Sequence, residues 1–140
     1  MYFIGENHIE RYKEALDSSE CVKPEPDGLN GKVDRYYGTA FYLLTATPSI
    51  WRKCKDYASD KGIYFDRIQQ EQDFSSSEEI TVMLARVLFE NRGTLPLSLI
   101  ILLSYTDVEL FNCCRSALSA FYCDNVTVAI KKAASVGERE

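Results

Sequence analysis

The residues in this sequence that could do chemistry begin with His8, the only histidine in the chain. Any reaction that needs an imidazole as general base would have to use it. Tyr12 follows four residues later, so on a helix the two side chains would share one face. No second titratable partner is visible for His8. We therefore expect a structural His8 that bonds Tyr12 or a nearby carbonyl, with a small enzyme that uses His8 and Tyr12 beside a pocket as the alternative.

The cysteines are the next candidates, and there are five: Cys21, Cys54, Cys113, Cys114 and Cys123. Their number is odd and no C-x-x-C spacing occurs. Adjacent cysteines on a helix point about 100° apart, which does not suit one metal ion. Glycine-rich phosphate loops, G-x-S-x-G and H-E-x-x-H motifs are missing as well. The sequence predicts neither a metal site nor a cofactor, and it shows no catalytic constellation.

Aromatic side chains indicate a different kind of function. The chain has nine tyrosines and one tryptophan, more than one helix face can bury. Partly exposed Tyr and Trp are typical of protein interfaces, although they also occur at the edges of cores. We take Tyr36, Tyr42 and Trp51, together with His8 and Tyr12, as the candidate binding residues.

Composition limits the classes of partner. With 140 residues, 46% of them hydrophobic and 26% charged, the chain can form one domain with its own core. A net charge of −5, spread along the sequence, argues against nucleic-acid binding. The cysteine pattern and the lack of a secretion signal predict a reduced, cytoplasmic protein without a membrane span. The expected partner is another protein, and a homodimer is compatible with surplus apolar surface.

The elements that position these residues are expected to pack around one apolar run. A helix over 95–105 is predicted, since Pro96 suits its first turn and leucine favours helices, and we expect its neighbours to cover it on all sides. Thr106-x-x-Glu109 resembles a capping box, so Thr106→Ala should cost roughly 0.5–2 kcal/mol. The helix that follows should end near Tyr122. Its expected inner face is Val108, Phe111, Cys114, Leu118 and Phe121.

Periodicity and caps predict the other helices. We expect them over 6–17, 33–46, 48–60, from the capping box Ser76-x-x-Glu79 to about 90, and over 125–134. Thr47 should cap the third helix, and Gly62 should end it in a left-handed conformation.

The remaining segments are expected to be irregular. Residues 21–32 are rich in proline and glycine and indicate an exposed loop, while 63–74 fit either a short strand or an irregular helix. Residues 136–140 should fray. The sequence thus predicts an all-α, single compact domain over 1–135, with six or seven helices around the buried 95–105 helix and at most a minor strand pair.

Three stretches also carry a family resemblance. Residues 2–12 place an aromatic–aliphatic pair before a histidine and an aromatic four residues later; 42–50 is an apolar helix running into a turn; 96–111 joins an apolar helix to its successor. In this order they resemble a family of small proteins of unknown function from Gram-positive bacteria and their prophages and mobile elements. The resemblance implies a mostly helical fold and a mobile-element setting, and it assigns no site. We therefore expect a cytoplasmic accessory or regulatory protein that acts by binding another protein.

Overall fold

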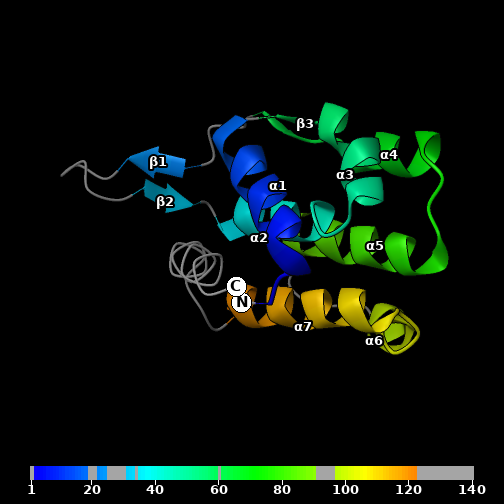
Figure 1. Cartoon of the computed structure of the whole chain (residues 1–140). Helices are drawn as coiled ribbons and strands as arrows, with labels where there is room; N and C mark the ends of the chain where they lie inside the picture. The colour runs from blue at the N-terminus through cyan, green and yellow to red at the C-terminus, as the bar shows by residue number, and fades with distance from the viewer. Residues whose placement is uncertain are drawn as a thin grey trace.

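The computed structural model describes residues 2–18, 22–24, 31–33, 35–59, 61–90 and 97–122. Within these residues the chain forms seven α-helices, one 3-10 turn and two short antiparallel strand pairs (Figure 1). The predicted all-α class is confirmed. The helix predicted over 125–134 and the frayed tail at 136–140 lie outside the described residues.

Helix α1 (Gly5–Ser18) agrees closely with the prediction over 6–17. The helices that follow are α2 (Arg35–Leu44), α3 (Pro48–Cys54), α4 (Phe65–Glu71), α5 (Ser76–Glu90), α6 (Leu97–Leu103) and α7 (Val108–Tyr122). The strand pairs are β1 (Val22–Pro24) with β2 (Gly31–Val33), and β3 (Ala58–Ser59) with β4 (Gly62–Ile63).

Helix α2 is the centre of the fold. It contacts α1, α3, α5 and α7, and Figure 1 shows it behind α1 and above α7. Residues 40–44 of α2 are apolar all round the helix and fully buried, as expected of a helix that neighbours surround. Arg11 of α1 holds the C-terminal end of α2, because its guanidinium donates to the carbonyls of Thr45 (2.8 Å) and Ala46 (3.1 Å).

Helix α6 lies at one end of the molecule, at the lower right of Figure 1. Leu99 and Leu103 face the core, whereas Ile101 and Leu102 are exposed. The prediction of a central helix covered on all sides is therefore wrong. An apolar run without periodicity fits a surrounded helix, but it also fits a helix with one face on the core and a second apolar face toward solvent.

Local capping chemistry determines where α3 and α5 begin. The Thr47 hydroxyl accepts the N–H of Ile50 at 3.1 Å, which confirms the predicted cap of α3. The capping box of α5 lies one residue earlier than predicted. Ser75 Oγ accepts the N–H of Glu78 at 3.3 Å, and Glu78 Oε1 accepts the N–H of Ser75 at 3.0 Å. Three consecutive serines offer three possible caps, and the packing of α5 selects the first.

The start of α7 also differs by one residue from the prediction. Asp107 Oδ1 accepts the N–H of Leu110 at 3.0 Å, whereas the Thr106 hydroxyl donates to the Leu103 carbonyl at 2.6 Å and closes α6. We expect Asp107→Ala to lower the free energy of unfolding by about 0.5–2 kcal/mol, because it removes both a cap and a negative charge at a helix N-terminus. Thr106→Ala should cost less. Urea denaturation of both variants checks this, and a larger loss for Thr106→Ala would contradict the assignment.

Short strand pairs replace parts of two predicted segments. β1 and β2 pair within the region expected to be a loop. Helix α3 is shorter than predicted: the chain passes at Lys55–Tyr57 into the 3-10 turn and then into β3, and Gly62 lies in β4 with φ +147° instead of capping a helix. Residues 63–74 were predicted to form either a short strand or a helix, and the structure has both, because strand β4 is followed by helix α4.

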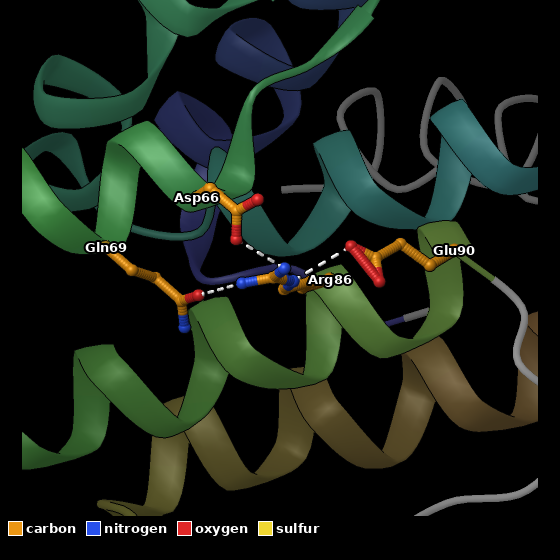
Figure 2. A network of polar contacts seen from close by, with 4 residues as sticks. All are labelled: Asp66, Gln69, Arg86 and Glu90. Carbon is orange, nitrogen blue, oxygen red and sulfur yellow. Dashed lines mark hydrogen bonds and ion pairs between the residues drawn. The ribbon is translucent and has the colours of Figure 1, made fainter.

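Arg86 on α5 holds α4 in place. Its guanidinium donates to Asp66 Oδ1 at 2.6 Å and to the amide oxygen of Gln69, both on α4, and to Glu90 Oε1 on its own helix at 2.9 Å (Figure 2). Arg86 is the only cation in the sequence of α5. Its charge is thus engaged by two carboxylates within the fold.

Candidate protein-binding surface

Three of the predicted site residues meet in one buried aromatic cluster. His8 and Tyr12 of α1 and Tyr42 of α2 are fully buried. The Tyr42 ring centroid lies 5.1 Å from that of His8 and 6.0 Å from that of Tyr12, and Phe3 packs against all three rings. The cluster joins the N-terminal segment, α1 and α2, so its first role is to hold the fold together.

Both ring nitrogens of His8 bond to the backbone. The N–H of Ile4 donates to Nδ1 at 3.1 Å, so the ring proton must lie on Nε2, which donates to the Tyr42 carbonyl at 2.9 Å. Burial lowers the pKa of His8 to about 4; the Tyr42 hydrogen bond opposes this shift and the Arg11 charge adds to it. The expected structural histidine is confirmed, with a carbonyl rather than Tyr12 as its partner.

Tyr42 does not belong to a surface. Its hydroxyl donates to the Tyr2 carbonyl, and burial raises the pKa of the phenol well above its ordinary value. The expectation that Tyr42 is a partly exposed binding residue is wrong, because the helix that carries it is enclosed by four others. His8 and Tyr12 are excluded from a contact surface for the same reason.

Tyr36 and Trp51 retain some exposure, but they pack in different places. Tyr36, at the start of α2, is 36% exposed, and its ring lies 5.8 Å from that of Phe121 on α7. Trp51 on α3 is partly buried and contacts Phe41 edge-on at 6.0 Å. The structure thus brings together His8, Tyr12 and Tyr42 and leaves Tyr36 and Trp51 outside that cluster.

The described cysteines are core residues. Cys54, Cys113 and Cys114 are buried, and burial raises the pKa of their thiols to about 12, 12 and 11 respectively. In the part of the chain that the structure describes, no group of three or more His, Cys, Asp or Glu residues could hold a metal ion.

We expect Cys54, Cys113 and Cys114 to resist alkylation in the folded protein. The thiolate is the nucleophile, and raised pKa values together with burial keep these thiols protonated and inaccessible. Iodoacetamide treatment at pH 8 followed by peptide mass spectrometry should show modification at these positions only after denaturant is added. Rapid labelling of Cys113 or Cys114 under native conditions would show that α7 separates from the core.

Among the described residues, five of the eight exposed large apolar side chains lie where α6 turns into α7. We call this set the α6–α7 patch; its members are Ile101 (55% exposed), Leu102 (37%), Tyr105 (75%), Val108 (74%) and Phe111 (39%). From Leu102 onward the members lie three residues apart, through the end of α6, the turn and the first turn of α7. The turn is fixed by backbone bonds from Ser104, Tyr105 and Thr106 to the last carbonyls of α6.

This patch was not predicted from the sequence, because α7 is apolar on two sides. Its buried side consists of Leu110, Cys113, Cys114, Ala117, Ala120 and Phe121. The predicted inner face mixed this side with a second stripe that begins at Val108 and Phe111, both exposed. The signal that could have separated them is Asp107: a cap at this position places Val108 at the very start of the helix, beside the turn.

The area of the patch is within the range of the largest apolar patch on an ordinary monomer, roughly 300–600 Å². The exposed fractions of its five side chains amount to on the order of 500 Å² of apolar surface, taking roughly 150–250 Å² for a full side chain. Patches of this size on monomers often bind other molecules. A standard interface buries about 800 Å² on each partner, so this patch could supply the apolar centre of one.

Neither family models, nor curated proteins, nor solved structures gave a significant match to this chain. Among the described residues no helix is both long enough and apolar enough to cross a membrane.

Proposed function

We propose that this protein is a cytoplasmic accessory or regulatory factor that acts by binding another protein through the α6–α7 patch. The observation that carries the proposal is the exposure of five large apolar side chains along one helix–turn–helix segment, α6 to α7. Tyr, Phe and Ile in such a patch can enter pockets of a partner without costing much conformational entropy. A mobile-element setting is supported by the resemblance of residues 2–12, 42–50 and 96–111.

The alternative of an enzyme that uses His8 and Tyr12 is not favoured by the geometry. A general base must reach the proton that it removes, directly or through one water. The His8 side chain is fully buried, and its two nitrogens are engaged by Ile4 and Tyr42. A substrate would have to displace the N-terminal segment to reach it.

The test compares three forms of the protein as bait in a lysate of its source organism. Tyr105→Ser with Val108→Ser removes the two most exposed members of the patch. Tyr64→Ser serves as a matched control, because Tyr64 is a 51% exposed tyrosine at the start of α4. We expect a partner that the wild type and the control retain and the double variant loses, at equal urea midpoints. Equal capture by all three forms would refute the proposal.

A further inference from the structure

We infer that the partner presents a basic amphipathic helix to the α6–α7 patch. This inference rests on the proposed function and specifies the chemistry of the partner. Two properties of the surface support it: the charges at its rim are acidic, and its backbone offers no free hydrogen-bonding edge.

The acidic rim comes from the first turn of α7, which carries part of the patch. The N–H of Asp107 donates to Ser77 Oγ at 3.1 Å, which holds the start of α7 against the first turn of α5. Asp107 and Glu109 flank Val108, a member of the patch, and both are exposed. Two exposed carboxylates therefore border the patch.

Few cations oppose these carboxylates. Arg115 is the only Lys or Arg in the sequence 97–122, and it lies two helical turns after Asp107. Arg86, the one cation of α5, is engaged by Asp66 and Glu90. Residues 97–122 thus carry two carboxylates, both beside the patch, against one guanidinium farther along α7. A partner with Lys and Arg around an apolar stripe is complementary to these charges.

The backbone of the patch favours a helical partner. The N–H groups of Ser104, Tyr105 and Thr106 bond to the carbonyls at the end of α6, and the hydroxyls of Ser104 and Thr106 bond to the same carbonyls. An extended peptide that adds as a β-strand needs an open edge to pair with, and this corner offers none. A helix satisfies its own backbone and contributes side chains at i, i+3, i+4 and i+7.

The same charges argue against a second copy of this chain as the occupant. A two-fold pairing through the patch would bring Asp107 and Glu109 of both copies to one interface, and like charges brought together weaken association. The net charge of −5 acts in the same direction, and it also disfavours an anionic membrane surface.

The experiment uses two labelled peptides of about 18 residues, five helical turns. Both carry leucine at i, i+3, i+4 and i+7; one has lysine at every flanking position and the other has glutamate. We expect the lysine peptide to bind the full-length protein at least about tenfold more tightly by fluorescence anisotropy, with a difference that shrinks as salt is added.

Substitutions in the protein show where the lysine peptide binds. Tyr105→Ser with Val108→Ser should abolish binding of the lysine peptide, and Glu109→Gln should weaken it several-fold. Glu10→Gln changes the charge equally at an exposed position of α1 and should leave binding unchanged.

The inference would be overturned if the two peptides bound equally, if neither bound, or if the α1 and rim substitutions weakened peptide binding equally. It would also be overturned if sedimentation equilibrium showed a dimer that the patch variant does not form. Binding to anionic vesicles that the patch variant loses would overturn it as well. If capture of the lysate partner still depends on Tyr105 and Val108, any of these results refutes only the basic helical partner. If capture does not depend on these residues, the proposed function fails as well.

Discussion

Replacing Phe41 with alanine is expected to lower the free energy of unfolding by about 3–5 kcal/mol. The Phe41 side chain is fully buried on α2, and its ring centroid lies 5.7 Å from that of Tyr37 and 6.0 Å from that of Trp51. The substitution removes apolar contacts and leaves a cavity at the point where the helices meet, and surrounding rings of this size cannot collapse fully into it. A typical domain has only about 5–15 kcal/mol of total stability.

The control for this prediction is Tyr64→Ala, which truncates an aromatic side chain that is half exposed. Surface truncations of this kind usually change stability by less than about 0.5 kcal/mol. Urea denaturation followed by far-UV circular dichroism measures both. Similar losses for the two variants would mean that α2 is not the centre of the core.

The second large effect is a loss of stability as the pH falls from about 6.5 to about 4. His8 has a pKa of about 4 in the folded protein, against 6.5 for an ordinary histidine. Between these values the unfolded chain binds a proton that the folded protein does not, so unfolding is favoured as the pH decreases. The full shift corresponds to about 3 kcal/mol. Protonation would also direct an Nδ1–H at the N–H of Ile4, which now donates to that nitrogen.

His8→Gln should flatten this pH dependence, because an amide can still donate to the Tyr42 carbonyl but does not titrate. The variant should be less stable than the wild type at pH 7, and the difference should shrink toward pH 5. Titrating carboxyl groups affect the stability only at the lower end of this pH range. Burial raises the pKa of Glu78, but hydrogen bonds from Ser75 and Ser49 have the larger effect, so the pKa is lowered. Equal slopes for both proteins between pH 6.5 and 5 would contradict the assignment.

Local signals predicted the parts of the fold that depend on local chemistry. The apolar spacing in α1 and the Thr47-Pro48 start of α3 were sufficient to place these elements. Where neighbouring residues could serve equally well, tertiary packing decided: Ser75 rather than Ser76 caps α5, and Asp107 rather than Thr106 caps α7. Which of these neighbouring residues forms the cap cannot be predicted from the sequence alone.

The candidate site was predicted less well, for a physical reason. A single histidine among apolar neighbours was correctly expected to be structural, since it had no partner to orient it. Tyr42 was assigned to a surface because tyrosine is amphipathic, but α2 is enclosed and the hydroxyl finds a carbonyl instead. The α6–α7 patch was missed because an apolar run carries no periodicity that would tell a covered side from an open one.

Site-specific photo-crosslinking inside cells of the source organism tests directly whether the α6–α7 patch binds a protein. A photoreactive amino acid is placed at position 105 in the patch or at position 64 on the control surface. If the α6–α7 patch binds a protein, position 105 yields a discrete crosslinked adduct that Val108→Ser diminishes, and position 64 yields none. Adducts from position 64 alone, or none from position 105, would show that the α6–α7 patch does not bind a protein.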